Sequence, residues 1–184
     1  MPIGQEKHLK LFFVLDGFCF NALFFNMTYN SFYFKVGNKF KILVNLSVNS
    51  FMGSETVCYK ILDMRPFDLD QNELISQFHK FSNLVFSEND NLNKIENIYI
   101  PKKEDYVYIY KLFKKIKVFN GNVYDLYLLI FRKISFFKLA AIIKIFRMAK
   151  ILKRTKESLI LINVKTKINL KNQPLFKKLT RNYI

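Results

Sequence analysis

The stretch that decides the fold runs over residues 56–85 and reads TVCYKILDMRPFDLDQNELISQFHKFSNLV. Its first nine residues alternate between two faces, with Val57, Tyr59 and Ile61 on one of them. This period of two is typical of a β-strand, so we predict a strand over residues 56–64.

A helix is predicted directly after this strand. Pro66 ends the strand, and Asp68 with Gln71 three residues later has the pattern of a capping box. The apolar residues that follow recur at helical spacing. We therefore predict an amphipathic helix over residues 69–85.

The remaining elements extend this pattern to β-α-β-β-α-β. The same criteria predict strands at residues 94–100, 123–134 and 158–168, a helix at 136–153 and a β-prone run at 106–110. This order predicts an α+β fold, the ferredoxin-like split β-α-β-β-α-β sandwich with both helices on one face of the sheet.

The connection between the second and third predicted strands exceeds the 2–5 residues of a tight hairpin. It is basic, so we expect a long hairpin arm there. The predicted organisation is an N-terminal extension at 1–54, a ferredoxin-like RNA-binding domain at 55–170 and a basic C-terminal tail at 171–184. Within the extension, Gly37-Asn38 predicts a hairpin turn.

The charge of the chain indicates a polyanionic partner. Its 184 residues include 30 Lys and Arg against 14 Asp and Glu, which gives a net charge of +16, and 51% of them are hydrophobic. Such a chain can bury a core and still present a basic surface, which suits nucleic acid or anionic lipid. Residues 132–184 hold 15 of the basic residues and a single acid, Glu157.

Two groups of residues are predicted to bind RNA, because cations can meet phosphates while aromatic rings stack on unpaired bases. On the arm they are Lys102, Lys103, Tyr106, Tyr108, Lys111, Lys114, Lys115 and Lys117. On the second helix they are Lys144, Arg147, Lys150, Lys153 and Arg154. This basic helix has three interpretations: a solvated face, an RNA-backbone surface, or an interfacial membrane helix.

The sequence offers no catalytic constellation, metal site or cofactor motif, so we expect a binding or structural protein and no enzyme. His8 and His79 are isolated, and no phosphate-binding Gly-rich loop occurs. Cys19 and Cys58 lie far apart without CxxC spacing, which favours two reduced thiols over a disulfide or a metal site.

A membrane segment is considered at residues 9–27, which are Phe-rich and about as long as a span. Asp16 near its centre would cost about 2.5–3.5 kcal/mol on insertion scales, so a span is disfavoured. Asp16 also interrupts the apolar core that a secretory signal needs, and no Arg- and Ser-rich import presequence is present. The many Phe, Lys, Asn, Ile and Tyr residues, which have A/T-rich codons, indicate an A/T-biased genome such as that of an organelle.

Residues 59–170 resemble the universal small-subunit ribosomal protein S-ten family. The first strand and helix, YKILDMRPFDLDQNELISQF, are similar to the family's first strand, Phe-Asp turn and helix. IYIPKKEDYVYIY resembles the opening of its long hairpin, and Tyr124-Asp125-Leu126 with Arg132 and Lys133 resembles its third strand. SLILINVKTKINL resembles its fourth strand.

This resemblance implies a structural constituent of the small ribosomal subunit head. It would bind the rRNA backbone, with Arg132 and Lys133 among its contacts, and neighbouring proteins of the S-three, S-nine and S-fourteen families. Together with the codon bias, it predicts a mitochondrial matrix protein active in translation, with no small-molecule substrate. The alternative is a small structural subunit of an inner-membrane respiratory complex, anchored by residues 9–27 and the basic helix.

Overall fold

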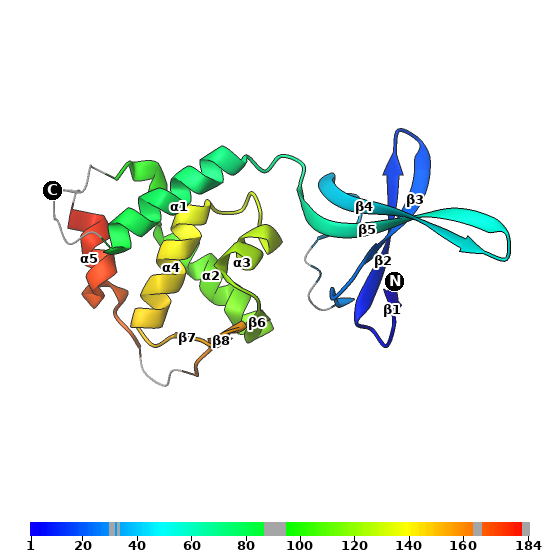
Figure 1. Ribbon diagram of the computed structural model, residues 1–184. Coiled ribbons are helices and arrows are strands. Elements are labelled where there is room, and N and C mark those ends of the chain that lie inside the picture. The colour runs from blue at the N-terminus through cyan, green and yellow to red at the C-terminus, as the bar shows by residue number, and fades with distance from the viewer. Residues whose placement is uncertain (30–31, 33, 87–94, 164–166, 182–184) are drawn as a thin grey trace. The chain divides into compact units, whose positions relative to one another are not determined.

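The computed structural model of the chain describes residues 1–29, 32, 34–86, 95–163 and 167–181. They form two compact units, Met1–Leu69 and Asp70–Ile184 (Figure 1). The division therefore falls at the start of the first predicted helix, whereas the domain boundaries predicted from the sequence lie after residues 54 and 170. The two units are described separately.

The first unit is a five-stranded sheet. Its strands are β1 (Pro2–Ile3), β2 (His8–Leu15), β3 (Phe18–Phe24), β4 (Phe40–Phe51) and β5 (Ser54–Pro66). They lie in the order β1-β2-β3-β5-β4, with β3 and β5 parallel and the other neighbours antiparallel. The predicted strand at 56–64 is confirmed as the central part of β5. Most of the predicted N-terminal extension is sheet.

Two-residue turns join the hairpins of this sheet. Asp16 and Gly17, between β2 and β3, have φ of 49° and 85°, and Met52 and Gly53, between β4 and β5, have 50° and 77°. Positive φ at both positions is the type I′ geometry that matches the twist of a hairpin. Residues 9–27, considered above as a span, thus contain the β2–β3 hairpin. In the described part of the chain, no helix is long and apolar enough to cross a membrane.

The core of the first unit lies on one face of the sheet. Ala22, Ile61 and Met64 are buried at its centre. Partly buried side chains pack around them, including Leu11, Phe13, Phe24, Phe32, Phe34, Phe40, Ile42, Val44 and Tyr59. Phe13 and Phe20, which face each other across β2 and β3, stack with their centroids 5.4 Å apart.

A turn forms one residue earlier than the predicted Gly37-Asn38: the amide of Asn38 donates to the carbonyl of Lys35 at 3.3 Å, which places Val36 and Gly37 at its centre. The predicted hairpin does not form, since only the following strand, β4, is present among the described residues. Of the predicted hairpin at residues 32–48, residue 33 lies outside the described part of the chain.

The hairpin of β4 and β5 extends past the other strands of this unit (Figure 1). The side chains of Leu46, Val48 and Val57 are 60%, 61% and 56% exposed, and Val48 and Val57 are cross-strand partners. This end of the sheet therefore exposes an apolar surface.

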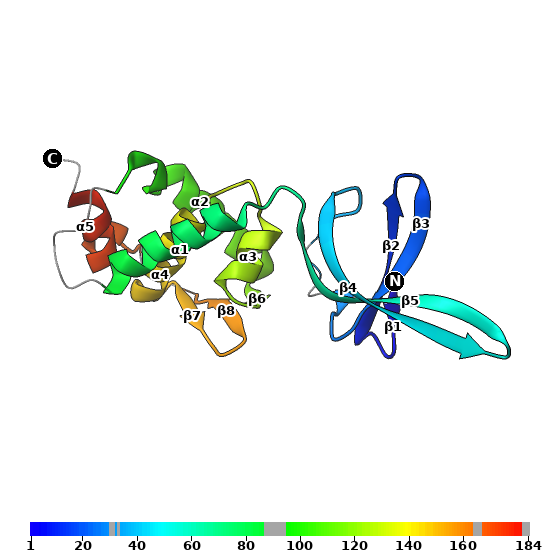
Figure 2. The same cartoon turned by 45° about the horizontal axis from the view of Figure 1, so that its top comes forward.

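The second unit is mainly helical. Its helices are α1 (Gln71–Phe86), α2 (Lys103–Ile116), α3 (Val123–Leu129), α4 (Phe136–Met148) and α5 (Pro174–Thr180). A small antiparallel sheet in the order β6-β8-β7 is formed by β6 (Val118–Asn120), β7 (Leu152–Arg154) and β8 (Ser158–Leu161). Figure 2 shows the β7–β8 hairpin projecting from the helices. Helices α3 and α4 follow each other in the sequence, with β6 before them and the β7–β8 hairpin after them.

Helix α4 forms the centre of the second unit. Nine of its 13 residues are buried, among them Phe137, Leu139, Ile142 and Ile145, each with no exposed area. Helices α1, α2, α3 and α5 and strand β7 all contact it. The helix predicted at 136–153 is therefore confirmed over its first 13 residues, while its end turns into β7.

Two predicted β elements are helices, and local contacts explain both. In α2, Asp105 Oδ2 accepts from the amide of Lys102 at 2.8 Å, and Tyr106, Ile109 and Phe113 are buried on one helical face. In α3, Asn122 caps the helix by accepting from the amide of Tyr124 at 2.7 Å. Capping and burial at helical spacing therefore outweigh the β-propensity of the Tyr and Val residues.

The prediction of a mixed α+β chain is confirmed, whereas the ferredoxin-like arrangement and its hairpin arm are not found. The predicted second strand contains a 3₁₀ turn, Asn97–Tyr99, and residue 94 lies outside the described part. The predicted fourth strand is shorter, as β8, and residues 164–166 lie outside the described part. The predicted tail contains α5.

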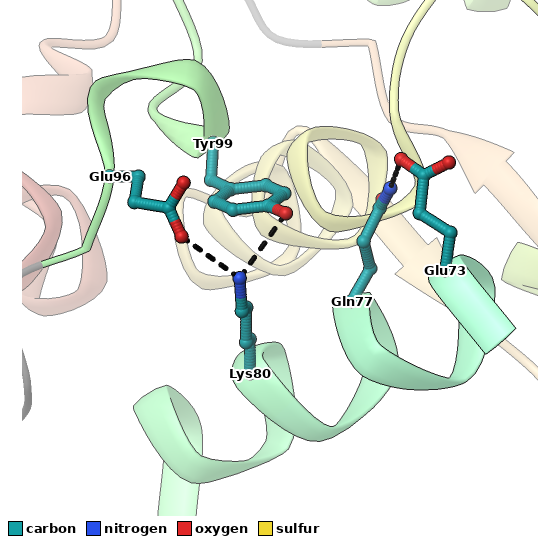
Figure 3. Close-up of polar contacts among 5 residues, drawn as sticks. All are labelled: Glu73, Gln77, Lys80, Glu96 and Tyr99. Atoms are coloured by element: carbon teal, nitrogen blue, oxygen red, sulfur yellow. Dashed lines mark hydrogen bonds and ion pairs between the residues drawn. The ribbon is translucent and has the colours of Figure 1, made fainter.

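Contacts of Gln77 and Lys80 fix helix α1 to the rest of the second unit, and Figure 3 shows the Lys80 contacts and the bond between Gln77 and Glu73 within α1. Gln77, 4% exposed, accepts from the amide of Phe137 at 3.0 Å and donates to Glu73 Oε1 at 2.9 Å. The first bond satisfies an amide at the start of α4 that has no partner within the helix. Lys80 Nζ lies 3.0 Å from Glu96 Oε1 and 3.2 Å from Tyr99 Oη, which raises the Lys80 pKa.

Gln77→Leu should destabilise the second unit by about 1–3 kcal/mol, because the buried Phe137 amide loses its acceptor. All α-helices of the described residues belong to this unit, so urea unfolding followed by the helical signal in far-ultraviolet circular dichroism reports on it. Gln71→Leu, the same change at an exposed position of α1, is the control and should stay within about 0.5 kcal/mol of wild type. Equal effects of the two changes would contradict this role of Gln77.

Tyr127, 8% exposed, packs edge-on against Phe136 with centroids 5.6 Å apart. Burial, with smaller contributions from Glu73 and Tyr124, raises the pKa of Tyr127 to about 12. Since the folded pKa lies above the unfolded value of 10.0, the resulting stability is present below pH 10.0 and lost as the pH rises toward about 12.

We expect Tyr127→Phe to remove one tyrosine that ionises late in an ultraviolet absorbance titration. The variant should also lose less stability than wild type above pH 10.0. An unchanged late-ionising fraction would contradict the assignment.

Candidate nucleic-acid interface

The face of the first sheet opposite its core carries a group of aromatic and cationic side chains. Leu9, Leu11 and Phe13 of β2 lie on the core side, so alternation places Lys10 and Phe12 on the outer side. Lys10 is paired with Leu23, and Leu23 with Lys60 of β5. Lys10 and Lys60 thus share one row of the sheet, two strand spacings or about 10 Å apart.

Two phenylalanine rings accompany these lysines. Phe12 is 70% exposed, and Lys10 Nζ lies 5.9 Å from its ring centroid. Phe25, which follows β3 directly, is 42% exposed and lies 6.0 Å from Lys60 Nζ. We call His8, Lys10, Phe12, Phe25 and Lys60 the outer-face cluster.

His8 holds the edge of this cluster in place. Its ring lies 4.9 Å from that of Phe25, and its Nδ1 accepts from the amide of Asn26 at 3.0 Å. Gly4, in the turn between β1 and β2, packs against it: a Cβ at Gly4 would come within 2.9 Å of His8 Cδ2. Gly4 also has a φ of 58°, a conformation that glycine adopts without steric cost, so glycine suits both the close approach and the backbone there.

This arrangement can bind a single-stranded nucleic acid. Exposed rings on a sheet offer flat surfaces on which bases stack, and neighbouring lysines neutralise phosphates. Stacking on aromatic rings tolerates every base, so such a surface favours single strands over a particular sequence.

The structure also places the RNA-binding residues predicted from the sequence. Eight of them lie on or next to α2, and the structure shows a helix where an arm was predicted: Lys102, Lys103, Tyr106, Tyr108, Lys111, Lys114, Lys115 and Lys117. Tyr106 is 9% exposed and packs between Phe146 and Phe176 at 6.1 and 6.0 Å. Tyr106 is therefore a core residue whose ring is closed to a base, and burial raises its pKa. Tyr108 remains 39% exposed.

The other predicted cations follow the course of α4. Arg132 and Lys133 precede the helix, Lys144 and Arg147 lie on its second half, and Lys150, Lys153 and Arg154 lie in the following turn and β7. The structure brings Lys144, Arg147 and Arg154 together around one cavity. Basic residues at the end of a helix also stabilise its dipole, so part of this charge has a structural role.

The outer-face cluster was not predicted from the sequence, because four of its five residues lie within residues 1–54, which were interpreted as an extension of the predicted domain. A signal was present: Asp16-Gly17 between two apolar runs is a strong indication of a hairpin. Phe residues on both faces of β2 hide its alternation. Among the described residues, no group of three His, Cys, Asp or Glu side chains could hold a metal ion, and Cys19 and Cys58 are unbonded.

Comparison with known families gives a match in the first unit. The family model described as the RecJ OB domain matches residues 1–63. OB domains are five-stranded Greek-key sheets that bind oligonucleotides or oligosaccharides on the face of strands 2 and 3. The five-stranded sheet described here agrees with this, and the match suggests nucleic-acid binding. No curated protein and no solved structure matches the chain.

The predicted membership of the ribosomal S-ten family is wrong. The family match falls on an OB domain, and it covers the N-terminal residues that the S-ten resemblance left out. The segment IYIPKKEDYVYIY, which resembled the start of a hairpin arm, is a 3₁₀ turn followed by α2. Matching residues over a short segment did not reflect a shared fold.

The lysines of α2 provide a test of the prediction made from the sequence. Lys111, Lys114 and Lys115 are exposed on one helix. If they contact phosphates, replacing all three by Gln lowers the slope of log affinity against log salt by about 0.7 per contact for a single strand. We expect a fall of this size for a short oligouridine. An unchanged slope would mean that these lysines do not contact phosphates and act only by stabilising the end of α2.

Proposed function

We propose that this chain is a nucleic-acid-binding protein without a catalytic step of its own, whose first unit holds a single strand across β2, β3 and β5. The observation that carries the proposal is the outer-face cluster, in which exposed Phe12 and Phe25 each lie beside a lysine. The OB-domain match supports it, because the cluster lies on the strands that such domains use.

The charge distribution assigns different tasks to the two units. Residues 1–69 contain seven Lys and Arg against five Asp and Glu, and residues 70–184 contain 23 against nine. The first unit therefore depends on stacking and a few well-placed cations. The second unit supplies most of the long-range attraction, which is sensitive to salt.

The small-subunit ribosomal role and the mitochondrial location remain predictions from the sequence. The first depended on the S-ten resemblance, and the second on that resemblance and the codon bias. The outer-face cluster and the OB-domain match favour the broader proposal of single-strand binding, in which RNA and DNA are both candidates.

Phe12→Ala should weaken binding of single strands by about 1–3 kcal/mol, roughly 5- to 150-fold in Kd, because a stacking surface is lost. The probes are labelled oligouridine and oligothymidine of about 15 nucleotides, within the site sizes of OB folds. A duplex of equal length should bind more weakly, and its affinity should change little in the variant. Fluorescence anisotropy measures all three.

Phe67→Ala is the matched control. Phe67 is 51% exposed and lies 5.3 Å from Lys41 Nζ, so it forms a similar pair outside the outer-face cluster. Its removal should leave the affinity unchanged. The proposal fails if Phe12→Ala and Phe67→Ala bind equally well, or if wild type binds neither single strand.

A further inference from the structure

The second unit contains an open cavity of about 480 Å³, bounded by α1, α3, α4 and β7. Its size lies within the range of ligand-binding sites. Most of its lining is apolar, including Leu74, Ile75, Phe78 and Phe81 of α1 and Phe136 and Ile143 of α4. The cavity lies entirely within residues 70–184 and is separate from the outer-face cluster.

The apolar wall on α1 is open to solvent. Ile75 and Phe78 are three residues apart, therefore on one helical face, and each is 52% exposed. The contacts of Gln77 and Lys80 fix this helix on either side of Phe78. Exposed apolar side chains beside a preformed cavity are typical of an interaction site.

Three cations line the same cavity. Lys144 and Arg147 come from successive turns of α4, and Arg154 comes from β7. No acidic side chain is among the described residues that line the cavity, and none of the three cations forms an ion pair with a described residue. The cavity therefore combines an apolar wall with uncompensated positive charge.

The position of α1 argues against a duplex as the ligand. In helix-turn-helix proteins the second helix enters the major groove. Here that helix is α4, and nine of its residues are buried, with α1 packed against it. The lining combines aliphatic side chains such as Leu74, Ile75 and Ile143 with Asn122 and Tyr124, so bulky apolar side chains find contacts over most of the wall.

We propose that this cavity binds an acidic amphipathic helix of a partner protein, whose bulky apolar side chains enter between α1 and α4 while its carboxylates meet Lys144, Arg147 and Arg154. The binding mode is a helix in a groove, with anchors on one helical face. Arginine forms bidentate hydrogen bonds with carboxylates, which orients the partner.

The test uses the full chain and a labelled synthetic peptide of about 15 residues, or four helical turns. The peptide carries Leu and Phe on one helical face and Glu elsewhere. Anisotropy should show saturable binding. Replacing the peptide's Glu by Gln, or its Leu and Phe by Ala, should each weaken binding about tenfold or more, and neither change touches the protein.

Two charge-reversal variants complete the experiment. Lys144→Glu, Arg147→Glu and Arg154→Glu together should weaken peptide binding by about tenfold or more. The control variant carries Lys111→Glu, Lys114→Glu and Lys115→Glu, which make the same change of charge in the same unit away from the cavity. It should weaken peptide binding by less than about threefold. Ile75→Ser removes an exposed apolar side chain from the wall and should also weaken peptide binding. Circular dichroism checks that each variant is folded.

Three outcomes would overturn the proposal. The peptide could fail to bind wild type, or both triple variants could weaken binding equally, which would indicate general electrostatic attraction. Oligouridine could displace the peptide from wild type and from Phe12→Ala alike, which would make the cavity a nucleic-acid site. Failure of single-strand binding by the outer-face cluster would leave this proposal standing, because the two sites lie in different units.

Discussion

The register of the β2–β3 hairpin is the constraint on which the candidate interface depends. Asp16 and Gly17, both with positive φ, form a two-residue turn that pairs Leu15 with Phe18 and fixes every later pair. Side chains alternate along a strand, so a slip of one residue would turn Phe12 into the core and Phe13 outward. The same geometry at Met52 and Gly53 sets the pairing of β5 with β4.

The second unit depends on the burial of α4. A helix that is apolar on nearly all sides must be enclosed, and four other helices and β7 do so. Lys138 forms an ion pair with Asp105, with 3.3 Å between Nζ and Oδ2. Lys144 and Arg147 are the charged residues left at the rim, which is why positive charge and apolar surface meet there.

Elements with two agreeing signals could be predicted from the sequence. The strand within β5 had clear alternation and a proline at its end, and α1 had apolar periodicity and an Asp near its start. The residue that caps α1 is Asp70 in place of the predicted Asp68, because Asp70 Oδ1 accepts from the amides of Asn72 and Glu73. In α2 and α3, the β-propensity of Tyr and Val conflicted with the helical spacing of Ile109, Phe113 and Leu126, whose complete burial decides for the helix. In β2, Phe residues on both faces concealed the alternation.

Of the candidate sites, the spacing of Lys144 and Arg147 was visible in the sequence, and their meeting with Arg154 was not. Their position around one cavity needs the turn from α4 into β7, which the predicted helix at 136–153 did not include. The outer-face cluster depends on which face of β2 is covered, and the apolar residues on both faces leave this undecided without the tertiary structure.

The apolar end of the β4–β5 hairpin links solubility to ligand binding. Strand β4 is the last in the sheet order, and Leu46, Val48 and Val57 are exposed nearby, which is a surface prone to edge-to-edge association. A net charge of +16 keeps copies of the chain apart. Salt screens this repulsion, and a bound polyanion neutralises it, so a long nucleic acid both gathers chains on one strand and lowers the barrier to their self-association.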